Sequence, residues 1–336
     1  MGLPRSKYVR DGEIGVYHCT SRCVRRAFLS GYDAYSGRDY SHRKAWIEDR
    51  LHQLASIFAV DISSFSVLSN HYHVTLRTRP DIAAGWSDYE VARRWLILCP
   101  IRYRSKKKPE VAVEEHINAL AVCRERIAEL RQRLSSLSWF MGRLNEYIAR
   151  AANKEDKVKG RFWESRFKCQ VLLDDAAIAA CMVYVDLNPI RSSLAASPEN
   201  SDFTSIQLRI RAYRKEMKAA ESNTQGKPGP STCWLCPVSS LTDTNGILPM
   251  TETEYFDLVD RTGRLIRRDK RGAIGDDLGP ILQRIGVRPE SWSDTVSKFE
   301  DKFRLAAGLL PNLRDFAKRM GQRWFTGVHA AQASFI

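Results

Sequence analysis

Residues 62–78 read Ile-Ser-Ser-Phe-Ser-Val-Leu-Ser-Asn-His-Tyr-His-Val-Thr-Leu-Arg-Thr, and this stretch carries the most informative pattern of the chain. Two runs with a period of two are separated by Ser69-Asn70, a turn signal, so the segment predicts a β-hairpin. In the second run the side chains divide into an apolar face of Tyr72, Val74 and Leu76 and a polar face of His71, His73, Thr75 and Arg77. We expect the apolar face to pack in a core and the polar face to carry chemistry.

The pattern on either side of this hairpin predicts an α+β protein. A strand is expected over 14–22, where Val16, His18, Thr20 and Arg22 share one face, and a further strand over 161–173. Apolar residues recur at helical spacing over 40–58, 113–153 and 176–187. The second of these helices is expected to break near Ser135-Ser136, and the third to begin after Asp174-Asp175 and to stop before Pro189. The predicted order is strand, helix, hairpin, helix, strand, helix.

The chain is longer than this core requires. Residues 80–112 look irregular and contain the basic stretch 105–109, so an exposed, mainly helical insertion is expected over about 80–137. We expect a core over 1–200, a linker over 201–230 that includes the Gly- and Pro-rich residues 222–230, and an accessory region over 231–336. Helical patterns in that region cover 252–259, 278–285 and 292–310. Its basic cluster over 264–271 favours an additional module that binds nucleic acid, and the alternative is a subdomain that only packs on the core.

Composition restricts the class of partner. The 336 residues include 53 Lys and Arg against 39 Asp and Glu, a formal charge of +14, and hydrophobic residues make up 43% of the chain. Such a chain folds around a core and favours a polyanionic partner such as nucleic acid. No apolar run approaches the length of a membrane span, the N-terminus has no apolar leader, and the eight cysteines are scattered. We therefore expect a cytoplasmic protein with free thiols and no membrane partner.

Two pairs of residues could carry chemistry. His71 and His73 point the same way on a strand, so two imidazoles can share one divalent cation. Tyr184 and Asn188 lie four residues apart and would share one helix face, presenting a phenol and an amide oxygen to a common point. A tyrosine is a weak nucleophile at its ordinary pKa of about 10, and a Lewis acid beside it would favour the phenolate. Taken alone, the histidine pair is better explained as two polar residues on a solvated strand face, and the second pair as a core aromatic and a helix C-terminal residue before Pro189.

Together, four ordered blocks resemble a known family, the single-tyrosine HUH transposases, and within it the REP-associated tyrosine transposases and their insertion-sequence relatives. The resemblance covers roughly residues 8–195. Its blocks are Tyr17-His18-Cys19-Thr20-Ser21-Arg22, Ser69-Asn70-His71-Tyr72-His73, residues 160–168 (Gly-Arg-Phe-Trp-Glu-Ser-Arg-Phe-Lys) and residues 184–191 (Tyr-Val-Asp-Leu-Asn-Pro-Ile-Arg).

This resemblance implies a fold and a set of roles. The fold would be a ferredoxin-like antiparallel sheet with helices on one face, the HUH endonuclease core. Tyr184 would be the catalytic nucleophile, and His71, His73 and Asn188 would bind a divalent metal, Mg or Mn. The reaction would be cleavage and rejoining of single-stranded DNA through a 5′-phosphotyrosine intermediate and a free 3′-hydroxyl, as in DNA transposition.

The resemblance also implies partners. Single-stranded or hairpin DNA, associated with repeats, would be bound by basic residues along a single-stranded track, for which the candidates are Arg22, Arg166, Lys168 and Arg191. The protein would be a monomer or homodimer, associated with a bacterial nucleoid. The insertion and the region after residue 200 are not part of the family core, so the target sequence does not follow from the resemblance.

Three alternatives remain open at this stage. A domesticated, non-catalytic DNA-binding protein or regulator would keep the same core, although the presence of both histidines, the tyrosine and the asparagine favours catalysis. A replication-initiator or relaxase-like nickase would share the chemistry, yet no Walker-type loop is visible. Tyr147 is a rival nucleophile on a helix, but the residue four positions on is Ala151, which cannot bind a metal.

Overall fold

The computed structural model describes residues 4–24, 29–34, 37–101, 113–222, 233–266, 278–323 and 326–336, and it is built around one five-stranded sheet. The strands lie in the order β4-β5-β1-β6-β7. Their bounds are β1 Gly15–Arg22, β4 Val60–Val67, β5 His71–Thr78, β6 Lys168–Leu172 and β7 Ala306–Ala307. Neighbouring strands are antiparallel except β6 and β7, which are parallel. A separate two-stranded ribbon joins β2 (Tyr32–Asp33) to β3 (Arg38–Asp39).

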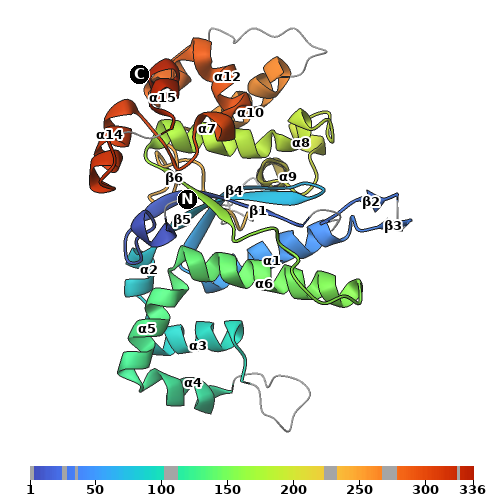
Figure 1. Ribbon diagram of the computed structural model, residues 1–336, viewed down its shortest axis with the longest axis vertical. Coiled ribbons are helices and arrows are strands. Elements are labelled where there is room, and N and C mark those ends of the chain that lie inside the picture. The colour runs from blue at the N-terminus through green and yellow to red at the C-terminus, as the bar shows by residue number, and fades with distance from the viewer. Residues whose placement is uncertain are drawn as a thin grey trace.

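The expected α+β fold is confirmed. The helices α1 (Arg43–Ile57) and α6 (Leu137–Glu155) lie side by side on one face of the sheet (Figure 1). With β1, β4, β5 and β6 they form the β-α-β-β-α-β order and the strand arrangement of a ferredoxin-like unit. The apolar face of β5 packs against these helices, and the hydroxyl of Tyr72 donates to Oδ1 of Asn145 at 2.8 Å. The sequence did not predict β7, which makes the sheet mixed.

The other face of the sheet is covered by α7 (Asp175–Asp186), the Ala-rich helix that carries Tyr184. Every residue of α7 from Ala176 to Asp186 is buried, and a helix without a polar face is stable only when it is enclosed on all sides. Its small side chains allow it to lie close to β4 and β5, and Cys181 reaches within 3.7 Å of the Thr75 hydroxyl. The predicted N-cap is confirmed, since Asp174 accepts a hydrogen bond from the backbone of Ala177.

The insertion forms a helical lobe at the far end of α6, at the bottom of Figure 1. Its helices are α2 (Pro80–Ala84), α3 (Asp88–Leu98), α4 (Glu114–Ala121) and α5 (Arg124–Leu134). The break expected at Ser135-Ser136 separates α5 from α6, and a second break at 122–123 separates α4 from α5. The basic stretch 105–109 lies outside the described residues.

The C-terminal region stacks above α7 (Figure 1). Two helices follow α7 before this region: α8 (Asn188–Arg191) and α9 (Ser205–Ser222). The helices of the region itself are α10 (Glu252–Ile266), α11 (Leu278–Arg284), α12 (Trp292–Ser297), α13 (Phe299–Lys302), α14 (Leu310–Arg319) and α15 (Val328–Ser334). Short 3-10 helices cover Arg5–Lys7, Pro198–Asn200 and Pro289–Ser291. The prediction of a helix over 292–310 is wrong beyond residue 302, because the chain there is extended and β7 pairs with β6.

The division into a core, a linker and an accessory region stays a prediction. Residues 205–222 of the expected linker are helical, and residues 223–232 lie outside the described residues, as do residues 267–271 of the basic cluster. Within the described residues, the C-terminal region contributes a strand to the main sheet. In the same part of the chain, no helix is both long and apolar enough to cross a bilayer.

A fully buried carboxyl group fixes the end of α7. Oδ1 of Asp186 accepts hydrogen bonds from the Ser205 hydroxyl and, at 3.0 Å, from the backbone of Ile206, both in the first turn of α9. Oδ2 accepts from the hydroxyl of Tyr255 on α10 at 2.5 Å. One side chain therefore ties three helices together.

We predict that Asp186→Ala lowers the free energy of unfolding by more than about 3 kcal/mol, because three buried donors lose their acceptor at once. Chemical denaturation measures the change. Asp260→Ala on α10 is the matched control, because its ion pair with Arg264 is exposed and should change the free energy of unfolding little. Equal losses for the two variants would contradict the role given to Asp186.

Candidate functional site

The strand register brings two histidines together on the α7 side of the sheet. Thr20 of β1 lies opposite His73 of β5, so His18, two residues along β1, is the diagonal neighbour of His73 on the same face. Nε2 of His18 is 3.0 Å from Nδ1 of His73, and the rings stack with centroids 5.2 Å apart. Both side chains are almost fully buried.

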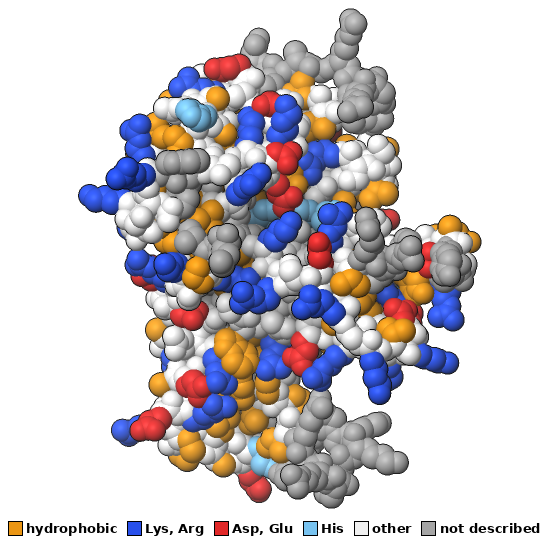
Figure 2. Space-filling model, viewed as in Figure 1, with side chains coloured by type: hydrophobic (Ala, Val, Ile, Leu, Met, Phe, Trp, Pro, Cys, Tyr) orange, Lys and Arg blue, Asp and Glu red, His pale blue; other side chains and the backbone are white. Residues whose placement is uncertain are grey.

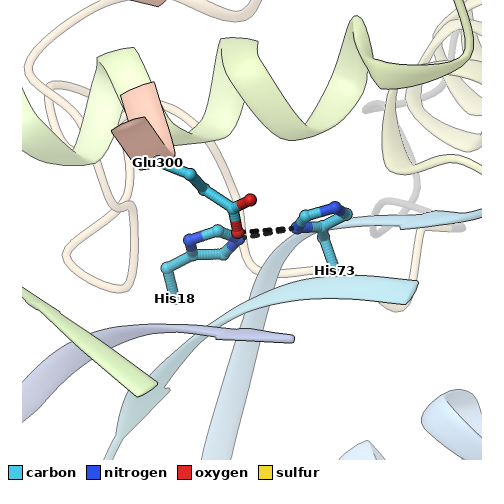
Figure 3. Close-up of side chains that lie close together, drawn as sticks. All are labelled: His18, His73 and Glu300. Carbon is cyan, nitrogen blue, oxygen red and sulfur yellow. Dashed lines mark hydrogen bonds and ion pairs between the residues drawn. The ribbon is translucent and has the colours of Figure 1, made fainter. Parts of the chain in front are cut away.

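Glu300 completes a group of three possible metal ligands. It comes from α13 and approaches the two imidazoles from the side opposite the sheet (Figure 3). Its Oε1 lies 3.6 Å from Nδ1 of His73 and accepts a hydrogen bond from the Thr20 hydroxyl at 3.2 Å. One ligand atom from each of His18, His73 and Glu300 lies within 4.8 Å of the others, so this group, the histidine cluster, can hold a metal ion.

Burial keeps the imidazoles of the site neutral. It lowers the pKa of His18 and His73, and in His73 the neighbouring His18 and His71 lower it further. The pKa of His71 falls to about 4, first through burial and then through the charge of Arg22. A neutral imidazole has a free lone pair, which is the form that binds a metal.

Tyr184 lies beside the cluster. Its ring is edge-on to both imidazoles, with centroids 6.0 Å from His18 and 5.7 Å from His73. The guanidinium carbon of Arg191 stands 3.8 Å from the centroid of the Tyr184 ring, and Nη1 of Arg191 donates to the Ser297 carbonyl at 2.9 Å. Burial and then the charge of Glu300 raise the pKa of Tyr184, while Arg191 opposes that rise. Without a further positive charge this tyrosine is a protonated phenol.

Of the other two residues expected to bind metal, the structure places His71 beside the cluster. The ring of His71 is 4.9 Å from that of His73, and its Nδ1 is 2.6 Å from Oδ1 of Asn70. Asn188 begins α8 after a break at Leu187 and is 4% exposed, and its amide nitrogen has no hydrogen-bond partner in the part of the chain that the structure describes. Their role as ligands stays a prediction, because the compact group joins His73 to His18 and Glu300 instead.

A cavity of about 490 Å³ opens beside the cluster. Three of the four residues expected to contact DNA, Arg22, Arg166 and Lys168, line it together with His18, His71 and Glu300. Arg191, the fourth, lies against Tyr184 instead. Figure 2 shows Lys and Arg side chains around the place on this face where histidines reach the surface.

The sequence missed His18 and Glu300. The alternation of β1 already placed His18 on the same face as Thr20 and Arg22, so a correct pairing of β1 with β5 would have found it. No sequence signal pointed to Glu300, because it comes from a distant segment that was expected to be one continuous helix. Tyr147 belongs to α6, which covers the other face of the sheet, and it is 44% exposed.

Comparison with known proteins does not establish a family. No protein-family model matches the chain, and no curated protein matches it either. One solved structure, described as a REP-associated tyrosine transposase bound to a REP hairpin, is similar with a TM-score of 0.32 and 10% identity, over 69% of this chain and 96% of that one. A likeness this distant carries no conclusion about activity, which has to come from the site.

We predict that the protein binds one Mn²⁺ ion through the histidine cluster and that His18→Ala and His73→Ala each weaken binding by at least about 10-fold. Calorimetric titration of the protein without DNA measures this. His329→Ala, which removes an exposed imidazole on α15, should leave the affinity unchanged. Loss of affinity in Asn188→Ala but not in His18→Ala would instead favour the ligand set expected from the sequence.

Proposed function

We propose that this chain is a transposase-type, metal-dependent strand transferase that cuts and rejoins single-stranded DNA, with Tyr184 as the nucleophile. The observation that carries the proposal is the position of a buried tyrosine ring within 6.0 Å, centroid to centroid, of both imidazoles of a group that can hold a metal. An oxygen nucleophile beside such a group suits displacement at a phosphodiester.

The residues present fit a divalent cation. Two neutral imidazoles and a carboxylate form a mixed nitrogen and oxygen donor set, which suits Mn and tolerates Mg. Nε2 of His73 is buried and has no hydrogen-bond partner among the described residues, so the protein alone does not satisfy every nitrogen of this group. We assign the cation to His18, His73 and Glu300, with His71 and Asn188 as the next candidates. When bound, it supplies Lewis acidity that polarises the phosphate and favours the phenolate.

The chemistry on the protein is a single exchange of bonds. Oη of Tyr184 forms a bond to the phosphorus of the DNA, and the bond from that phosphorus to the 3′-oxygen breaks. The phenol loses its proton and the departing 3′-oxygen gains one, which leaves a 5′-phosphotyrosine and a free 3′-hydroxyl. Because the ester conserves the energy of the broken phosphodiester, the reverse exchange rejoins DNA without ATP.

Two neighbours prepare Tyr184 for this step. Arg191 fixes the ring through its stacked guanidinium and is itself held by the Ser297 carbonyl. Phe299 also packs against Tyr184, with its ring centroid 5.9 Å from that of Tyr184. Tyr184 is only 6% exposed, so these two neighbours and the imidazoles enclose most of its ring.

The substrate proposed is single-stranded or hairpin DNA associated with repeats, in the cytoplasm of a bacterium. The net charge of +14 and the basic cavity beside the cluster support a polyanion, and the sequence blocks of the resemblance support the transposase type.

We predict that Tyr184→Phe abolishes the covalent protein–DNA adduct and leaves DNA affinity within about two-fold of wild type, because only the nucleophilic oxygen is removed. The assay is a denaturing gel of the protein with a pool of single-stranded hairpins labelled at either end, in Mg²⁺, Mn²⁺ and EDTA.

Tyr147→Phe, on the opposite face of the sheet, is the matched control and should form the adduct as wild type does. An adduct that persists in Tyr184→Phe would refute the nucleophile. Tight binding without an adduct in any metal would establish the domesticated DNA-binding protein in place of the enzyme.

A further inference from the structure

We propose that the cavity beside the histidine cluster is a subsite for the phosphodiester backbone of the single strand flanking the cut, and that Arg304 of the C-terminal region is one of its contacts. This inference rests on the proposed function and adds to it a binding element that lies outside the residues resembling the family.

The cavity adjoins the reaction centre. His18, His71 and Glu300 form one side of its lining, and the segment 164–170 and residues 300–304 form much of the rest. A strand whose scissile phosphate lies at the histidine cluster must therefore place neighbouring phosphates along this cavity or beside it.

The basic side chains that line the cavity are available to bind an external group. Arg22, Arg166, Lys168 and Arg304 are all exposed, and none of them forms an ion pair or a side-chain hydrogen bond within the described ranges. By contrast, arginines on the surface of the insertion are paired, as in Arg93 with Glu90 at 2.7 Å. Unpaired cations that converge on a cavity from three segments of the chain are arranged to meet an external anion.

The position of Arg304 is fixed by the main sheet. On one side of it, the carbonyl of Phe303 accepts a hydrogen bond from the Gln170 side chain, and on the other the carbonyl of Leu305 accepts one from the backbone of Val171 at 2.9 Å. Two links to β6, the strand that begins with Lys168, therefore hold Arg304 at the rim. The backbone of Arg304 is thereby fixed beside the cavity that its side chain lines.

The types of side chain that line the cavity indicate which part of the DNA it binds. Its one Phe, Tyr or Trp side chain, Phe303, is 1% exposed and offers no ring on which a base could stack. Charged side chains without a stacking surface bind phosphates and carry no sequence information. The subsite should therefore accept any single-stranded sequence.

Acidic side chains also line the cavity. Removing one of their charges should change the DNA affinity in the direction opposite to the removal of a basic charge. Glu164 and Asp301 line the cavity, and Glu300 is engaged by the histidine cluster. If phosphates occupy the cavity, removing a negative charge from Glu164 must strengthen binding, whereas removing the positive charge of Arg304 must weaken it.

The experiment is fluorescence anisotropy of a short labelled oligothymidylate with the full-length chain, in EDTA and over a series of salt concentrations. We expect Arg304→Gln to weaken binding and to reduce the slope of log affinity against log salt by about 0.7 to 1, as the loss of one phosphate contact requires. Glu164→Gln should tighten binding. Arg304→Lys should keep most of the affinity, since the charge remains.

The matched controls are Arg314→Gln and Asp315→Asn, which make the same changes of charge at exposed positions of α14 outside the cavity lining. Changes as large in these controls as in the cavity variants, or no change in Arg304→Gln, would overturn the subsite. The assay needs no cleavage, so a missing adduct in the gel assay would refute the proposed chemistry separately.

Discussion

Two carboxyl groups clamp α7 at its ends, and the position of Tyr184 beside the histidines depends on them. At the N-terminus, Asp174 caps the helix through Oδ1, while its Oδ2 accepts hydrogen bonds from the backbone of Leu309 at 2.6 Å and from the Asn312 side chain at 2.8 Å. At the C-terminus, Asp186 binds the start of α9 and the hydroxyl of Tyr255. An apolar helix has no polar contacts of its own that could fix its rotation on a sheet. The hydrogen bonds at the two ends of α7 fix this rotation, and they keep Tyr184 facing the histidines.

The same enclosure sets the electrostatics of the site. Burial raises the pKa of Asp186 to about 6, and the hydrogen bonds from Ser205 and Tyr255 oppose that rise. Burial also keeps the imidazoles neutral and disfavours the phenolate of Tyr184. A site arranged in this way has low intrinsic reactivity, because each shift stabilises the uncharged form. A divalent cation and a phosphate would together change that balance, which explains why the chemistry would begin only when both are present.

The C-terminal region contributes residues to the candidate site. Gly308 follows β7 directly, and a side chain there would collide with Asp174, since an added Cβ would lie 2.7 Å from Oδ2. The close approach of this segment to the start of α7 lets β7 pair with β6 and brings Glu300 and Arg304 to the site. A chain truncated after residue 200 would lose one candidate ligand and one rim of the cavity. Glu300 and Arg304 therefore link the C-terminal region to the candidate site.

The sequence by itself determined the order of the core elements, because period-two and helical patterns record which side chains face a core. It also predicted the helix cap at Asp174 from local spacing, and it proposed His73 and Tyr184 as candidates. Only the tertiary structure decided that His18 is the partner of His73, because strand register is set by packing across the sheet. Glu300, β7 and Arg304 depend on contacts between segments far apart in the chain. A local pattern cannot encode those contacts, since they form only when α7 has been enclosed and the C-terminal segment has closed over it.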